Sequence, residues 1–206
     1  MGNPESGDEC VIMNHMQEAI GRGVYNSHSL YVVRVLARPF ERQFHMPLAE
    51  IISSRVSDAL DLRRALGLGQ PGDCTVFRLL NGEGDGISGI IADLYAGTAV
   101  VECSALWGEI NRSIIEQAIQ TQVEAALSCS GGPGVQVIWK SVAKRLLLDG
   151  YPPPAPPNPH HEDPVGQVVF ENGVRFKVFP GCGQKTGFYC DQRGSRLMLR
   201  NLAGGG

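Results

Sequence analysis

A proline-rich segment divides this sequence into two unequal parts. Residues 151–164 contain seven of the thirteen prolines in the 206-residue chain. Because proline lacks a backbone N–H and has a fixed φ, such a segment can form neither a helix nor a central strand. We therefore predict a surface loop or linker here, with regular structure on either side of it.

The longer part, before the linker, alternates between helix and strand patterns. Apolar residues recur at helical spacing over residues 47–68, where acids come early and arginines late before a glycine, and again over residues 110–127. Both stretches are predicted to be helices. Further strands are expected at 74–80, 87–93, 98–103 and 135–139, and a short helix at 141–148. Together these elements predict one α+β unit over residues 47–150.

The amino-terminal residues show weaker strand patterns. Short alternating or β-branched runs predict strands at 9–13, 19–25 and 31–36. Between the last two lies Tyr25-Asn26-Ser27-His28-Ser29, whose ring and polar groups suit stacking on a base and hydrogen bonding to RNA. A turn with ordinary turn chemistry is the alternative for these residues.

Residues 165–206 begin with a hairpin signal, because Asn172-Gly173 lies between apolar runs at 168–171 and 174–179. The hairpin leads to the run from Gly183 to Arg193, which brings an amide, an ammonium, a hydroxyl, two aromatic rings, a carboxylate and a guanidinium together between glycines. Such a density of unlike polar groups is typical of a ligand-facing turn.

Two other interpretations of residues 183–193 start from the same side chains. A phosphate-binding loop needs Gly directly before Lys and another Gly five residues earlier. Gln184 precedes Lys185 and Phe179 stands at the first glycine position, so the spacing excludes that loop. A structural turn stays open, in which Asp191 is the N-cap of a helix with a solvated basic face. The arginines expected on that face are Arg193, Arg196 and Arg200.

A net charge of −3 at pH 7 excludes nucleic-acid binding over the whole surface, so RNA contact must come from local basic patches. The sequence contains two. The first consists of Arg22, Arg34, Arg38 and Arg42, and the second of Arg175, Lys177, Lys185, Arg193, Arg196 and Arg200. Each patch has the alternative of an ordinary solvated face.

Cysteines and histidines show no metal-ligand spacing. None of the six cysteines forms a Cys-x-x-Cys pair, and free thiols suit a reducing compartment. The acids among the glycines of residues 81–86 lack calcium-loop spacing and predict a tight turn. The polar amino terminus does not resemble a secretory signal, and no apolar run approaches a membrane span. We therefore expect a cytoplasmic protein without a metal site.

Residues 183–193 closely resemble the signature Gly-Gln-Lys-Thr-Gly-Phe-Phe/Tyr-Leu-Asp-Gln-Arg of the S-adenosylmethionine-dependent methyltransferases that modify cytosine C5 in large-subunit ribosomal RNA. Cys190 replaces the usual Leu, and Gly194 stands where that family has an acidic or amide residue. The run from Arg78 to Tyr95 resembles the family's central α+β segment. Residues 7–36 resemble the second half of its PUA-type RNA-binding domain.

The resemblance implies three units: a partial PUA-like β-barrel over residues 1–42, the central domain over 47–150, and a hairpin with the start of the methyltransferase region over 165–206. We expect the incomplete barrel to be loosely held or to lean on a neighbour. The residues implied to face S-adenosyl-L-methionine are Gln184, Lys185, Thr186, Gly187, Phe188, Tyr189, Asp191 and Arg193. Those implied to contact RNA are Arg22, Tyr25, Asn26, Ser27, His28 and Arg34.

The resemblance ends at about Arg200, before the family's catalytic domain. We therefore expect a fragment that lacks the start of the PUA-like domain and all catalytic residues, with Cys182 and Cys190 as ordinary thiols. Such a chain would bind ribosomal RNA but would not methylate it alone. A non-enzymatic RNA-binding or interaction module is the alternative, and a scaffold without RNA affinity is a third possibility.

Overall fold

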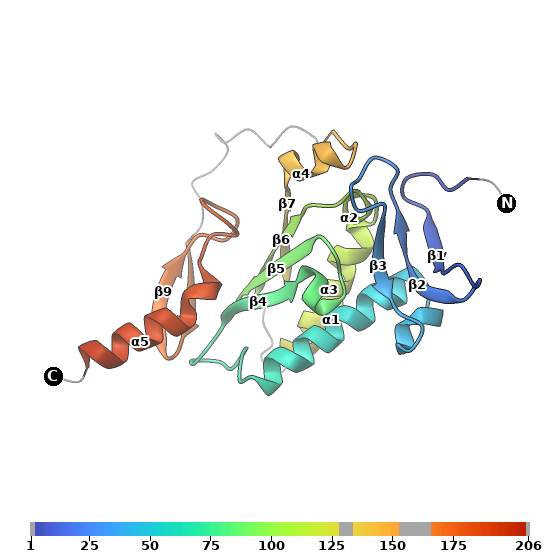
Figure 1. Cartoon of the computed structure of the whole chain (residues 1–206). Helices are drawn as coiled ribbons and strands as arrows, with labels where there is room; N and C mark the ends of the chain where they lie inside the picture. Colours follow the sequence, from blue (N-terminus) through green and yellow to red (C-terminus); the bar gives the residue numbers. More distant parts are fainter. Residues whose placement is uncertain (1–2, 128–133, 153–165, 205–206) are drawn as a thin grey trace.

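The computed structural model describes residues 3–127, 134–152 and 166–204. Its strands form three sheets (Figure 1): an amino-terminal sheet at one end, a four-stranded sheet in the middle, and a hairpin with helix α5 at the other end. The mixed α+β class is confirmed. Residues 153–164 of the predicted linker lie outside the described residues. Within the described ranges, no helix has both the length and the apolar character needed to cross a bilayer.

The amino-terminal sheet is antiparallel, in the order β1 (Glu9–Met13), β2 (Ala19–Tyr25), β3 (Val33–Ala37). The bounds of β1 and β2 are those predicted, and β3 is shifted by one or two residues. The described residues form no closed barrel here. The sheet packs on the central unit, because Val24 and Leu36 are buried in the main hydrophobic cluster, so the expected contact with a neighbour is confirmed.

The central sheet has the order β4 (Val76–Asn81), β5 (Ile90–Tyr95), β6 (Thr98–Cys103), β7 (Gln136–Ser141). The first three strands are antiparallel, whereas β6 and β7 are parallel. A parallel pair needs a crossover, which helices α2 (Leu106–Ile110) and α3 (Arg112–Leu127) provide. The remaining central elements are η1 (Arg42–His45), α1 (Leu48–Ala65), η2 (Gly82–Asp85) and α4 (Ala143–Leu148).

One local expectation is corrected in this unit, and one is refined. The single helix predicted over 110–127 is interrupted at Asn111, whose side-chain amide donates to the carbonyl of Trp107 (2.8 Å) and whose own carbonyl accepts the first hydrogen bonds of α3. Asn competes for backbone hydrogen bonds in this way, which favours helix ends. The tight turn predicted over 81–86 lies between the antiparallel strands β4 and β5, as expected of a hairpin, and contains the short 3₁₀ helix η2, which Gly86 ends at a φ of 68°.

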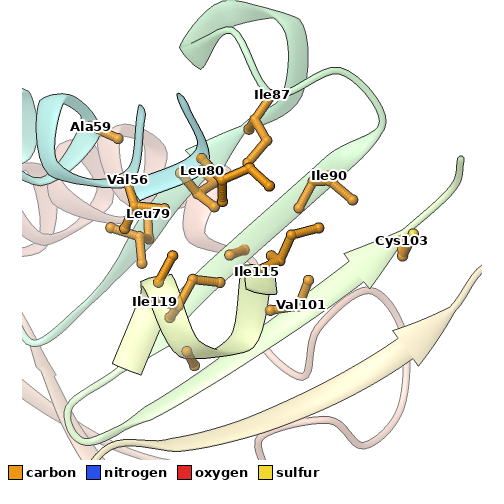
Figure 2. Packing of buried hydrophobic residues seen from close by; sticks show 14 of the residues in the cluster. Val56, Ala59, Leu79, Leu80, Ile87, Ile90, Val101, Cys103, Ile115 and Ile119 are labelled. Atoms are coloured by element: carbon orange, nitrogen blue, oxygen red, sulfur yellow. The ribbon is translucent and has the colours of Figure 1, made fainter. Parts of the chain in front are cut away.

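Helices α1 and α3 cover one face of the central sheet and enclose the main hydrophobic core. Figure 2 shows how Val56 of α1, Leu79 of β4 and Ile119 of α3 meet there. All three side chains are fully buried. Burial of apolar surface from helix and strand together is the dominant favourable contribution to such a fold.

The opposite face of the central sheet is covered by the hairpin β8 (Gln167–Glu171) and β9 (Val174–Val178) and the segment that follows it. This second cluster consists of Val76, Tyr95, Val100, Val169 and Val178, with Ile138, Phe176, Phe188 and Cys190 packed against it. The backbone N–H of Thr75 donates a hydrogen bond to the carbonyl oxygen of Phe170 (2.9 Å). The hairpin predicted from Asn172-Gly173 is confirmed.

Helix α5 (Arg193–Ala203) follows the short 3₁₀ helix η4 (Cys190–Gln192) and projects from the hairpin end of the molecule (Figure 1). None of its residues is buried. Met198, Leu199 and Leu202 are 65%, 65% and 69% exposed, whereas Arg196 and Arg200 reach back to the hairpin. An ordinary surface helix buries its apolar side chains and exposes its charged ones. In α5, several apolar side chains are exposed and arginines make contacts with the rest of the protein.

Candidate functional site

The loop of residues 183–189 has a strained backbone. Gly183, Lys185 and Gly187 have φ values of 74°, 53° and 118°. A lysine in the left-handed region costs about 1 kcal/mol, and such strain is typically stored at functional sites. Gly187 is required for a second reason, because a Cβ there would lie 2.4 Å from the carbonyl oxygen of Phe179. The loop therefore has one defined path between β9 and α5.

Thr186 anchors this loop to the central sheet. Its side chain is fully buried, its hydroxyl donates a hydrogen bond to the carboxylate of Asp93, and its oxygen lies 2.8 Å from that of Tyr95. The same carboxylate accepts a hydrogen bond from Arg78. Strand alternation puts Asp93 and Tyr95 of β5 on the face that the loop covers. The middle of the loop is thus fixed by a network that is buried and satisfied.

The neighbours of Thr186 point outward and form an open polar surface. Lys185 Nζ lies 2.7 Å from the Asp191 carboxylate and 4.5 Å from the centroid of the Tyr189 ring, and both charged side chains are about half exposed. The hydrogen bond from Lys185 lowers the pKa of Asp191 below its usual range. The hydroxyl of Tyr189 donates to the side-chain oxygen of Gln184. Four of the predicted donor-facing side chains therefore lie together and accessible.

Phe188 and Arg193 are less accessible than these four residues. The ring of Phe188 is half-buried, 5.4 Å from that of Phe176, and the guanidinium of Arg196 lies 4.4 Å from its centroid. Arg193 is partly buried with Nη1 3.9 Å from the Sγ of Cys74. Phe188 therefore packs the loop against β9, and Arg193 contacts the segment that precedes β4.

The arginines of α5 are not the solvated face that the structural interpretation expected. Arg196 forms two hydrogen bonds of 2.6 Å with the buried carboxylate of Glu171, which raise its pKa, and Arg200 donates to the carbonyl of Asn172. Asp191 is not the N-cap of this helix either. Helix α5 begins at Arg193 after Gln192 and has no side-chain cap, because the carboxylate of Asp191 is engaged by Lys185.

The thiols next to the loop differ in their surroundings. Burial raises the pKa of Cys190, as does the nearby carboxylate of Asp93, so this thiol stays protonated at neutral pH. Cys182 is exposed. The cysteines in the described ranges form no disulfide, and the described His, Cys, Asp and Glu side chains form no cluster that could hold a metal ion.

Three of the residues expected to contact RNA are engaged within the protein. Asn26 is buried and donates to the carbonyl of Asp149 (3.0 Å), and Arg34 lies 3.1 Å from Ser88 Oγ and 3.6 Å from the Asp149 carboxylate. Arg22 donates to Glu9 and to the backbone of residues 44 and 46. These three side chains attach the amino-terminal sheet to its neighbours.

The other three candidates lie at the end of the middle strand β2 and in the turn that follows it. Ser27 and His28 are exposed, and Tyr25 is half-buried. The structure therefore leaves Ser27 and His28 accessible to a ligand. The amino-terminal sheet to which β2 belongs lies at the opposite end of the molecule from the hairpin that leads to the loop of residues 183–189 (Figure 1).

A groove of about 1260 Å³ lies between β3 and the η2 turn. Arg34, Arg55, Glu83 and Glu102 are among its lining residues, so its walls carry both signs of charge. No residue of 183–193 lines it. The groove and the polar loop are separate features.

Sequence reasoning missed the residues that hold the loop and helix α5 in place. Asp93, Tyr95 and Arg78 form the network around Thr186, and Glu171 pairs with Arg196 of α5. Asp93 could have been found from the sequence, because it is a charged residue inside the apolar run of β5. A carboxylate on a strand that is buried on both faces needs a hydrogen-bonding or ionic partner. The partners themselves, up to 93 positions away, have no local signature.

Residues 1–38 match the family model described as a PUA-like domain. Over 98% of its length the chain is 31% identical to ribosomal RNA large subunit methyltransferase I of Alteromonas mediterranea, of which it covers 47%. The chain resembles half of an RNA methyltransferase. A protein of the same name from Shewanella frigidimarina is 29% identical, with 99% of this chain and 48% of that protein covered.

Solved structures show the same fold. A candidate SAM-dependent methyltransferase from Streptococcus mutans superposes with a TM-score of 0.68 at 19% identity, covering 98% of this chain and 47% of that one. A crystal structure of a candidate methyltransferase in complex with SAH gives a TM-score of 0.69 and covers 97% and 46%. The chain spans about half the length of the curated relatives and solved structures that it matches.

Proposed function

We propose that this chain is the RNA-binding and donor-facing part of an S-adenosylmethionine-dependent methyltransferase of large-subunit ribosomal RNA. The observation that carries the proposal is the loop of residues 183–189, which buried Thr186 fixes to the central sheet while its polar neighbours stay open. Similarity to ribosomal RNA large subunit methyltransferase I over 98% of the chain supports it. We also infer three functional units, over residues 1–42, 47–150 and 165–206.

The open side chains suit the chemistry of the donor, which supplies a methyl group on a sulfonium sulfur. The carboxylate of Asp191 would accept hydrogen bonds from hydroxyl or ammonium groups, and Lys185 would pair with a carboxylate. The ring of Tyr189 offers a flat apolar wall. Gln184 has both a donor and an acceptor. Phe188, Gly187, Thr186 and Arg193 would act by shaping the loop.

The open side chains of the loop would contact a ligand on one side only. Lys185 and Asp191 are 41% and 54% exposed, and the loop lines no part of the groove between β3 and η2. A ligand held on one side keeps much of its contact with water, which limits affinity. We therefore expect weak donor binding by this chain alone, and we assign no catalytic residue to it.

Titration with S-adenosylhomocysteine tests this assignment. Isothermal calorimetry should give little heat, whereas amide chemical shifts should change within residues 184–193 at millimolar ligand. Lys185→Ala and Asp191→Asn should remove those changes, and His15→Ala, on an exposed turn at the other end of the molecule, should not. Micromolar affinity would contradict a one-sided site, and shift changes confined to other residues would exclude the loop.

A non-enzymatic RNA-binding module is the second candidate function, favoured by the PUA-like match over residues 1–38. Both candidates require RNA binding whose affinity falls steeply as salt rises, because phosphate contacts release counterions. Filter binding to large-subunit ribosomal RNA at two salt concentrations measures this. RNA binding without any response to S-adenosylhomocysteine would favour the second candidate, and no RNA binding would exclude both.

A further inference from the structure

The hairpin β8–β9 has an inner face that explains its attachment. Its register pairs Val169 with Phe176 and Gln167 with Val178. Val169 and Val178 are buried against the second face of the central sheet. Glu171 also points inward, where its side chain is 1% exposed and neutralised by Arg196. The only acidic residue of the hairpin is therefore hidden and paired.

The outer face of the same hairpin is basic and aromatic. Register pairs Val168 with Lys177 and Phe170 with Arg175, and these residues alternate with the inner set. Val168 is 51% exposed, and both cationic residues are exposed. Just beyond β9, the ring of Phe179 is 38% exposed and lies 5.7 Å from Lys177 Nζ.

These two cations are not used to hold the fold together. Most buried or half-buried arginines of the described chain form ion pairs, as Arg63 does with Asp85 and Arg78 with Asp93. Arg175 and Lys177 form no ion pair with any described residue, and no acid shares their face of the hairpin. In a chain of net charge −3, this is a concentrated positive surface.

Such a surface suits single-stranded nucleic acid better than a protein partner. Cations two positions apart on a strand stand ~7 Å from each other, which lets both reach one phosphate backbone. Exposed rings beside cations provide stacking platforms for unpaired bases. An ordinary solvated face needs no aromatic side chains, and an apolar protein interface would not centre on two unpaired charges.

We propose that the outer face of β8–β9 binds a single-stranded segment of RNA, with Arg175 and Lys177 at its phosphates and Phe179 stacked on a base. The proposal rests on the proposed function and adds a place for the substrate. Residues 179–182 connect this face directly to the loop of residues 183–189, since Gly181 N–H donates to the carbonyl of Thr186 (2.8 Å). RNA held here would lie next to the donor-facing side chains.

Fluorescence anisotropy with a labelled single-stranded oligoribonucleotide, measured over a series of salt concentrations, tests the proposal. The variant Arg175→Ala/Lys177→Ala should bind more weakly, and its slope of log K against log salt should be shallower by about 1.4, because each single-strand contact contributes about 0.7. Phe179→Leu should weaken binding about tenfold without changing the slope. The matched control is Lys144→Ala/Arg145→Ala, which removes two exposed cations from α4 and should preserve both values.

The outcomes separate this proposal from the proposed function. If the wild-type chain binds RNA and Arg175→Ala/Lys177→Ala keeps its affinity and slope, the hairpin is not the RNA surface, although the proposed function stands. Tighter binding to duplex than to single-stranded RNA would also overturn the stacking proposal. If the wild-type chain binds no RNA, the proposed function itself fails. Thermal melts of each variant establish that it is folded.

Discussion

The hydroxyl of Thr186 donates a hydrogen bond to the carboxylate of Asp93, 93 positions earlier in the chain. This contact links a surface loop to the interior of the central sheet, because the same carboxylate also pairs with Arg78. The polar side chains on either side of Thr186 therefore owe their position to a buried network. Disturbing that network should displace the loop.

Replacing Thr186 tests the anchor directly. Thr186→Val keeps the shape but leaves the carboxylate of Asp93 and the hydroxyl of Tyr95 short of a partner, so it should lower the free energy of unfolding by about 1–3 kcal/mol. Thr186→Ser retains the hydroxyl and should cost less. Urea denaturation measures both variants. Equal stability of the two would mean that the hydroxyl has no anchoring role.

Two glycines of the loop form a matched pair. Both have positive φ, but a Cβ at Gly183 meets nothing within 4 Å, whereas one at Gly187 meets the carbonyl of Phe179. Gly183→Ala should cost about 1 kcal/mol from backbone strain alone. Gly187→Ala adds overpacking and should cost about 3 kcal/mol. Similar losses for the two variants in chemical denaturation would show that the close approach is unimportant.

Gly194 offers a stabilising change. It lies in the first turn of α5, and a Cβ there would meet no atom within 4 Å. Gly194→Ala should stabilise the helix by about 0.5–1 kcal/mol, because alanine loses less conformational entropy on folding. Amide hydrogen exchange within α5 should slow accordingly. Unchanged or faster exchange would mean that the helix end is restrained in a way that alanine cannot satisfy.

Thiol reactivity should separate exposed from buried cysteines. Cys182 is exposed and should react quickly with iodoacetamide, whereas Cys74, Cys103 and Cys190, whose pKa values burial raises, should react only after unfolding. Peptide mass spectrometry after timed quenching identifies the labelled sites. Rapid labelling of Cys190 in the folded protein would indicate an activated thiolate and would contradict its assignment as an ordinary thiol.

Stability should fall in alkaline solution. Burial raises the pKa of Cys74, Cys103 and Cys190 above 9.0 and that of Tyr95 above 10.0. The folded state therefore holds protons that the unfolded chain releases, so the free energy of unfolding is unaffected below about pH 9 and decreases above it. Each such group contributes at most about 1.4 kcal/mol per pH unit.

Urea denaturation at pH 7.5, 9.5 and 10.5 measures this dependence. Cys190→Ala removes one of the linked protons, so its loss of stability between pH 9.5 and 10.5 should be smaller than that of the wild-type chain. An identical pH dependence for the two proteins would show that the Cys190 thiol ionises as freely in the folded state as in the unfolded chain.

The sequence predicted most of the elements but few of the contacts between them. Strands β1, β2 and β6 have their expected bounds, because period-two alternation and flanking turn residues are local signals. The break at Asn111 was missed because apolar periodicity continues through it. Burial of Asn26 and the pairing of Arg196 with Glu171 depend on residues distant in the chain, which no local pattern encodes.

The loop of residues 183–189 likewise shows that a local sequence pattern does not predict which contacts its side chains make. Its composition marked Gln184, Lys185, Tyr189 and Asp191 as a group, and the structure places them together. Composition could not show which side chains of the loop point into the protein and which point to solvent. Thr186 and Phe188 were therefore grouped with them, although Thr186 anchors the loop and Phe188 packs against Phe176. Their role toward a methyl donor stays a prediction.

Helix α5 keeps its place largely through arginine contacts, since Leu199 and Leu202 are mostly exposed and none of its residues is fully buried. Segments with few buried apolar contacts open far more often than the domain as a whole unfolds. Trypsin cleaves after arginine, and each opening would present Arg193, Arg196 and Arg200 to it. Limited digestion should therefore trim the carboxy-terminal end first and leave the sheets behind it intact.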